Sequence, residues 1–230
     1  MTDNFCKRGG RNTVMVTVHG ANISPFVRKV RVFLAEKNIA YTLQPVNPFT
    51  AGPEYRKLSP LGRIPAFQDD KTTLADSSVI CAYVERTNPQ PALYPTEAVT
   101  YARALWFEEY GDGGLAPIFG GEIFRQRVVM PLFFKQQGDE AMAQKAIAEK
   151  LPPLFDYLEG QIGDNAFLVG NHLSIGDIGV ATQFVNLRHA GVTPDAQRWP
   201  QLSRYLASIH GRPSFKAVIE EEEAGLKKAK

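Results

Sequence analysis

The chain lacks several features that would assign it to a specialised class of protein. It has two cysteines, Cys6 and Cys81, among 230 residues, too few for a disulfide framework or a four-cysteine zinc site. No apolar run approaches the ~18 residues that a membrane-spanning helix needs. The N-terminus has no apolar segment of signal-peptide length. We therefore expect a cytoplasmic protein with no membrane partner and with both thiols reduced.

The chain also lacks a marked excess of one charge. It has 26 Lys and Arg against 24 Asp and Glu, a net charge of +2, whereas nucleic-acid-binding proteins usually carry a clear basic excess. The four histidines show no ligand spacing with cysteines or carboxylates. We therefore expect no nucleic-acid partner and no metal site. Hydrophobic residues at 44% and charged residues at 22% are typical of a globular protein.

The first half of the chain opens with a strand, a helix and a second strand. Residues 14–18 form a β-rich apolar run. Ser24-Pro25 is a helix-start signal, because proline suits the first helical turn, and apolar residues at helical spacing continue to Lys37. Residues 41–46 predict the next strand. A β-α-β order favours a parallel strand pair with a right-handed crossover.

Two further strands and a helix complete this half. After a loop rich in proline and glycine, residues 62–68 predict a strand entered through a proline, and residues 72–74 predict its returning partner. Asp76-Ser77-Ser78 then caps a helix. The order is therefore βαβ followed by ββα.

The second half predicts helices throughout. Residues 87–96 hold three prolines without periodicity and predict a linker. The glycines at 111–114 predict a bend, and the acidic run Glu220–Glu223 predicts a solvated helix end. The charged tail 220–230 is expected to fray. We expect a flexible arm at 1–12, an α/β domain at 13–90 and an all-α domain at 97–230. The predicted helices cover 97–110, 139–162 and 174–188, with two shorter ones beginning at Pro200 and Pro213.

Four local motifs, in this order and at this spacing, resemble those of the glutathione transferase superfamily, in a cytosolic, serine-type bacterial form. The resemblance covers nearly the whole chain after the arm. It implies a thioredoxin-like N-terminal domain followed by an all-α helical bundle, with glutathione as co-substrate and no other cofactor. The motifs are Ser24-Pro25-Phe26, Gly62-Arg63-Ile64-Pro65, Leu74-Ala75-Asp76-Ser77-Ser78-Val79-Ile80 and Ser174-Ile175-Gly176-Asp177.

Ser24 is the predicted catalytic residue. It immediately precedes a helix, where unpaired backbone N–H groups and the helix dipole favour an anion such as a thiolate. The resemblance implies that Ser24 donates a hydrogen bond to the sulfur of glutathione. Taken alone, the same serine could be only a helix cap. Relatives with cysteine at this place form mixed disulfides with glutathione, a reaction that serine cannot perform, so Ser24 favours conjugation.

The remaining motifs imply residues that bind glutathione. Pro65 is implied to be cis, with Ile64 pairing to the cysteinyl unit like an added strand. Arg63 either reaches the glycyl carboxylate or is a solvated loop charge. Asp76 and Ser77 are implied to hold the γ-glutamyl unit at a helix N-terminus.

Other residues of the motifs have different expected roles. Phe26 is a candidate for the pocket of the second substrate, together with aromatic residues of the first C-terminal helix. Ser174 and Asp177 have capping-box spacing, which we assign to folding. The aromatic candidates of the helix predicted at 97–110 are Trp106, Phe107 and Tyr110.

The resemblance implies a homodimeric enzyme that conjugates glutathione, as its thiolate, to small hydrophobic electrophiles for detoxification. Two alternatives stay open at this point. One is a glutathione-dependent isomerase or dehalogenase, since such relatives also use a serine near a helix start. The other is a non-enzymatic carrier or regulatory protein that binds glutathione without accelerating any reaction.

Overall fold

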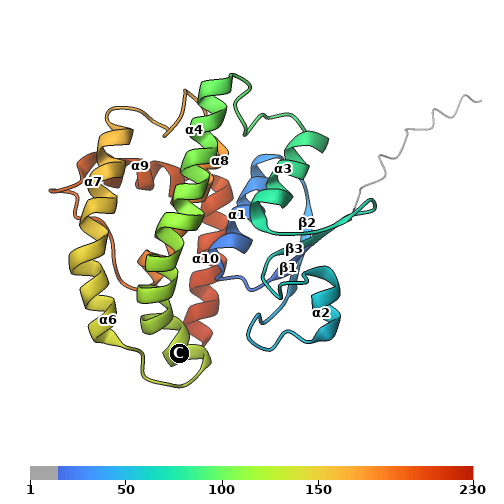
Figure 1. The fold of residues 1–230 in the computed structure, drawn as a ribbon, viewed down its shortest axis with the longest axis horizontal. Coiled ribbons are helices and arrows are strands. Elements are labelled where there is room, and N and C mark those ends of the chain that lie inside the picture. Colours follow the sequence, from blue (N-terminus) through green and yellow to red (C-terminus); the bar gives the residue numbers. More distant parts are fainter. Residues whose placement is uncertain (1–14, 230) are drawn as a thin grey trace, which may run out of the picture.

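The computed structural model describes residues 15–229, so the arm predicted at 1–12 lies outside the described residues. Its N-terminal half contains a four-stranded sheet in the order β2-β1-β3-β4 (Figure 1). The β1–β2 pair is parallel, whereas β3 runs antiparallel to both β1 and β4. The strands are β1 (Val16–Gly20), β2 (Tyr41–Pro45), β3 (Ala66–Gln68) and β4 (Thr73–Ala75).

The first strand begins and ends later than its apolar run predicts. β1 extends to Gly20, because His19 still pairs with Gln44 on β2 and with Ala66 on β3. Alternate residues of β1 are buried, beginning with Val16. This end of β1 matters for the site, since the chain passes directly from it into the loop that carries Ser24.

Three helices accompany the sheet and confirm the predicted βαβ-ββα order. α1 lies between the sheet and the C-terminal helices, where it packs against α3, α8 and α10 (Figure 1). These helices are α1 (Pro25–Glu36), α2 (Pro53–Leu58) and α3 (Ser77–Thr87).

The second half is all helical, as predicted. Two continuous helical segments, 98–133 and 140–162, are followed by three separate helices. The first segment consists of α4 (Ala98–Glu109), η1 (Tyr110–Leu115), η2 (Pro117–Val129) and α5 (Met130–Phe133), and the second of α6 (Glu140–Lys145), η3 (Ala146–Lys150) and α7 (Leu151–Ile162). The last three are α8 (Ile175–His189), α9 (Pro200–His210) and α10 (Pro213–Ala229).

The centre of the helical half is α8, in which every residue from Ile175 to Leu187 is buried. Its start carries the predicted capping box, with the Asp177 carboxylate accepting from the backbone N–H of Ser174 at 2.8 Å. The same carboxylate accepts from Leu168 N at 2.8 Å and from the Tyr205 hydroxyl at 3.0 Å. Asp177 thus fixes the start of α8 in the core.

The predicted bend at glycines 111–114 is wrong, because the helix runs through them. Gly111 faces α8 so closely that a Cβ there would lie 2.6 Å from the carbonyl oxygen of Gly179. A Cβ on Gly176 would likewise lie 3.0 Å from Ala104 O on α4. Glycine therefore lets two helix backbones touch here, a role that local sequence patterns do not reveal.

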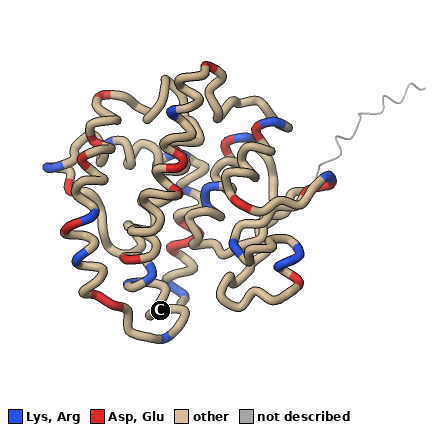
Figure 2. Tube along the Cα trace, viewed as in Figure 1, with Lys and Arg blue, Asp and Glu red and all other residues tan. Residues whose placement is uncertain are grey.

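The predicted solvated end at Glu220–Glu223 is also wrong for Glu222. The α10 helix continues to Ala229, and Glu222 has no exposed surface. Within residues 15–229, no helix is both long enough and apolar enough to span a membrane. Figure 2 shows Lys and Arg interspersed with Asp and Glu along the trace.

Candidate active site

Ser24 caps the start of α1, immediately after the loop that leaves β1. Its side-chain oxygen accepts a hydrogen bond from Val27 N at 3.4 Å, and Pro25 occupies the first helical turn. A serine hydroxyl that accepts one bond can still donate its own proton. The first backbone N–H groups of α1 point the same way, and the helix dipole places partial positive charge there. A thiolate at this point would therefore be stabilised.

The loop around Ser24 is held by α8. The carbonyl oxygen of Pro25 accepts a bond from the Thr182 hydroxyl at 3.0 Å, and that of Ile23 accepts one from Asn186 Nδ2 at 3.5 Å. Both carbonyls flank Ser24 directly, and both donors lie one turn apart on α8. Ser24 therefore takes its position from the helical half as well as from the sheet.

Arg28, on α1, contacts the same two residues of α8. Its Nη1 donates to Thr182 O at 2.6 Å and to Asn186 Oδ1 at 2.8 Å. Its Nε and Nη2 donate to the two carboxylate oxygens of Glu222 at 2.8 and 2.6 Å, and neither side chain is exposed. His189 Nε2 lies 2.8 Å from Glu222 Oε2. Burial alone would raise the pKa of Glu222, but Arg28 and His189 outweigh burial and lower it.

A cavity of about 710 Å³ opens beside this loop, between the two halves of the chain. One wall comes from the N-terminal half and the other from α4, η1 and η2. The first wall includes Phe26, Arg63, Ile64, Asp76 and Ser77, and the second includes Glu109, Asp112, Gly113, Ala116 and Pro117. Five of the seven predicted site residues therefore line this cavity, and Pro65 follows Ile64 directly but is not among the lining residues. Ser24 is in the adjacent turn but is not among the lining residues.

The Ile64–Pro65 peptide bond is cis, and Pro65 is buried. The carbonyl oxygen of Arg63 accepts bonds from the Tyr55 hydroxyl at 2.8 Å and from the Ser59 hydroxyl at 2.7 Å. These bonds fix the backbone that leads into Ile64, whereas the Arg63 side chain is exposed at the cavity. A fixed backbone edge of this kind can pair with an extended peptide.

The start of α3 forms the floor of the cavity. Asp76 has a backbone φ of 82°, and its Oδ1 accepts from Ser78 N at 2.9 Å and from Val79 N at 3.2 Å. Ser77, the first helical residue, is buried at the cavity wall. Its N–H group is among the four that lack a partner inside the helix. The helix start can therefore accept a carboxylate while Asp76 offers negative charge beside it.

A buried charge cluster lies next to the start of α3, and the sequence analysis does not predict it. Lys29 Nζ, which has no exposed surface, lies 2.5 Å from Asp112 Oδ2 and 2.6 Å from Glu108 Oε1, and donates to the Ser78 hydroxyl at 2.9 Å. Burial alone would lower the pKa of Lys29, but the two carboxylates outweigh burial and raise it. No local pattern signals this cluster, because its members come from α1, α3, α4 and η1.

The other predicted aromatic residues do not line the cavity. Phe107 is fully buried in the core. Trp106 donates through Nε1 to the Tyr157 hydroxyl at 2.8 Å, and the Tyr110 hydroxyl donates to Leu154 O at 3.2 Å. These two side chains therefore face α7. Cys81 is also buried, and burial raises the pKa of its thiol, so it is not a nucleophile under ordinary conditions.

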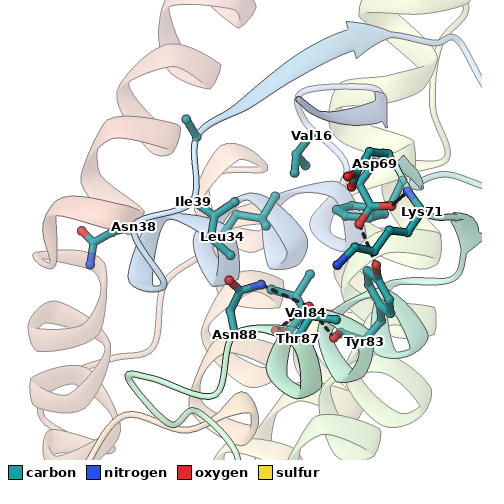
Figure 3. Close-up of a pocket in the computed structure, with 13 residues that line it drawn as sticks. Val16, Leu34, Asn38, Ile39, Asp69, Lys71, Tyr83, Val84, Thr87 and Asn88 are labelled. Atoms are coloured by element: carbon teal, nitrogen blue, oxygen red, sulfur yellow. Dashed lines mark hydrogen bonds between the residues drawn. The ribbon is translucent and has the colours of Figure 1, made fainter. Parts of the chain in front are cut away.

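A second cavity, of about 590 Å³, lies at the opposite end of β1 (Figure 3). It is lined in part by Val16, Asp69, Lys71 and Tyr83, and the Tyr83 hydroxyl donates to Asp69 Oδ2 at 2.7 Å. None of the predicted site residues line it. Among the side chains of residues 15–229, no three His, Cys, Asp or Glu groups are arranged to hold a metal ion.

Comparison with known proteins assigns the family. Residues 18–92 match the model of the glutathione S-transferase N-terminal domain, and residues 124–222 match that of its C-terminal domain. The chain is also 31% identical over 198 residues to the probable maleylacetoacetate isomerase 1 of Drosophila melanogaster, covering 83% of this chain and 75% of that protein. The chain belongs to the glutathione S-transferase family.

One further sequence relative and one solved structure are also similar to this chain. A glutathione S-transferase of Triticum aestivum is 28% identical over 225 residues, covering 95% of this chain and 99% of that protein. A glutathione transferase homologue of Drosophila mojavensis, solved with bound glutathione, is 25% identical with a TM-score of 0.76, covering 94% of this chain and 98% of that one. The thioredoxin-like half and the helical half are thus those of the glutathione S-transferase fold, and glutathione is the co-substrate of this family.

Proposed function

We propose that this protein is a glutathione transferase that holds glutathione as its thiolate beside Ser24 and conjugates it to hydrophobic electrophiles. The observation that carries the proposal is the position of the Ser24 hydroxyl at the start of α1, next to the interdomain cavity. There the hydroxyl and the unpaired amides lower the thiol pKa from its free value of ~8.5. The cavity supplies proximity to the second substrate.

The walls of the cavity fit the other parts of glutathione. The γ-glutamyl carboxylate binds the start of α3 at Ser77, and its ammonium group lies near Asp76. The cysteinyl unit pairs with the backbone of Ile64 beside cis-Pro65, and the glycyl carboxylate reaches Arg63. Phe26 contributes to the pocket of the second substrate. The resemblance to the family implies these assignments, and the charge and hydrogen-bonding capacity at Ser77, Asp76, Ile64 and Arg63 support them.

A glutathione-dependent isomerase is the second candidate, because a relative 31% identical to this chain is named as a probable maleylacetoacetate isomerase. Isomerisation would use the same bound thiolate, which adds to a conjugated double bond and leaves again after rotation. The two activities therefore differ in the second substrate and not in the role of Ser24. Homodimeric assembly and a cytoplasmic location also stay predictions, and sedimentation velocity would test the first.

The experiment that tests the proposal is Ser24→Ala. We expect glutathione to bind with little change in affinity, while turnover of an activated aryl chloride falls by roughly 10²-fold, as for loss of one donor to a reacting anion. Ultraviolet difference spectroscopy should show the pKa of bound glutathione moving back toward its free value. Ser208→Ala, an exposed serine on α9, is the matched control. Wild-type turnover by Ser24→Ala would refute the proposed role.

A further inference from the structure

The cavity beside Ser24 carries an excess of negative charge. Among its lining residues, three are acidic, namely Asp76, Glu109 and Asp112, and one is basic, Arg63. The lining therefore has a formal charge of −2 (three negative and one positive). The nearest buried cation, Lys29, does not offset this excess, because it is already shared between Asp112 and the buried Glu108.

Glu109 places its carboxylate on the wall formed by the helical half. Its Oε1 lies so close to Gly113 that a Cβ added to that glycine would be 2.3 Å away. The side chain thus folds along its own helix, one turn forward, onto the cavity lining. Glycine at 113 leaves the space for this arrangement. Unlike Asp112, Glu109 contacts no lysine or arginine within salt-bridge distance in the described part of the chain.

Bound glutathione makes this environment more negative. Its two carboxylates and its thiolate outnumber its single ammonium group, and in the proposed mode the glycyl carboxylate occupies Arg63. A second substrate that carries a carboxylate would then meet the thiolate and Glu109 without a cation to pair with. Glu109 and Asp76 are exposed at the cavity, so these like-charge contacts are screened by salt and are strongest at low ionic strength.

We propose that the second substrate of this enzyme is an uncharged or cationic electrophile, and that Glu109 is a specificity-determining residue that disfavours carboxylates. The inference rests on the proposed function and names its substrate class. For an uncharged aryl chloride, the thiolate forms a C–S bond to the ring carbon, and the C–Cl bond breaks with chloride leaving as the anion. The step needs no further reactant. The same reasoning disfavours an acidic substrate for the isomerase alternative.

The test compares a chlorodinitrobenzoate with its primary amide, which differ in charge but not in the leaving group. Each kcat/KM is divided by the uncatalysed rate constant with glutathione, because the two rings differ in reactivity. We expect the wild-type protein to prefer the amide, and this preference to narrow as ionic strength rises. Glu109→Gln should raise the acid-to-amide ratio by about threefold or more.

Glu149→Gln is the matched control, since Glu149 is exposed on η3 and does not line the cavity. It should leave the acid-to-amide ratio at the wild-type value. Equal normalised rates for the two compounds in the wild-type protein, or an unchanged ratio in Glu109→Gln, would overturn this inference while the proposed function stands. Failure to conjugate either compound would overturn the proposed function, and this inference with it.

Discussion

Gly111 offers a sharp test of how the helical segment 98–133 meets α8. A Cβ at this position would lie 2.6 Å from Gly179 O and 2.7 Å from Gly179 C, whereas ordinary contacts begin at 3.4 Å. Gly111→Ala therefore requires the α4–η1 segment and α8 to separate by roughly 0.8 Å, since the clashing atoms are backbone and cannot rotate away.

Two opposing contributions determine the change in the free energy of unfolding. Overpacking of a core contact costs up to ~3 kcal/mol, and alanine in place of glycine recovers ~1 kcal/mol of helix propensity. The expected loss is therefore up to about 2 kcal/mol, which lowers Tm by up to about 8 °C for a chain of this size. Urea unfolding followed by circular dichroism measures the free energy directly.

Gly120→Ala is the control, because no atom lies within 4 Å of a Cβ added at Gly120 in the same continuous helix. It should stabilise the protein by up to ~1 kcal/mol. The two alanine variants are then expected to differ by up to about 3 kcal/mol. If Gly111→Ala is as stable as Gly120→Ala, the close approach of the two backbones is not a constraint on the fold and the reasoning fails.

Two further predictions concern buried titratable groups. Burial lowers the pKa of His210 from 6.5 to about 4, so the unfolded chain takes up the proton first and stability falls as the pH drops through this range, by up to ~1.4 kcal/mol per unit. His210→Gln should flatten the change in unfolding free energy between pH 7 and pH 5, and a slope equal to that of the wild type would contradict the assignment. Asp177→Ala removes the acceptor for donors on Leu168, Ser174 and Tyr205, and should cost about 3–5 kcal/mol in thermal unfolding. A wild-type Tm in that variant would show that the capping carboxylate is dispensable.

Features encoded by neighbouring residues could be predicted from the sequence. Ser24 and Asp76 were expected at helix starts because capping depends on a few consecutive residues, and both caps are present. The capping box at Ser174 and Asp177 follows the same rule. The order of strands and helices along the chain required only the alternation of strand and helix patterns. The bounds are less accurate, since β1 is shifted by two residues and β3 begins at Ala66, four residues later than predicted.

Features that join distant segments could not be predicted in this way. Glu222 belongs to an acidic run that is typical of a solvated helix, and only the fold brings it to Arg28, 194 residues earlier. The glycines at 111–114 predict a bend by local propensity alone. The close contact with α8, which explains why glycine is present at 111, lies outside what local propensity describes. The same limit applies to the helical wall of the cavity, since Glu109 and Asp112 meet the N-terminal half only in three dimensions.

The contacts of Arg28 also bear on how the protein comes into being. During synthesis from the N-terminus, the loop that carries Ser24 emerges long before Asn186 and Glu222 exist. Until then the guanidinium has no carboxylate, and burying it without one is unfavourable. The loop that carries Ser24 is therefore expected to reach its final position late. An N-terminal half expressed alone, or grafted onto a helical half lacking these partners, would be left with an unmatched charge next to this loop.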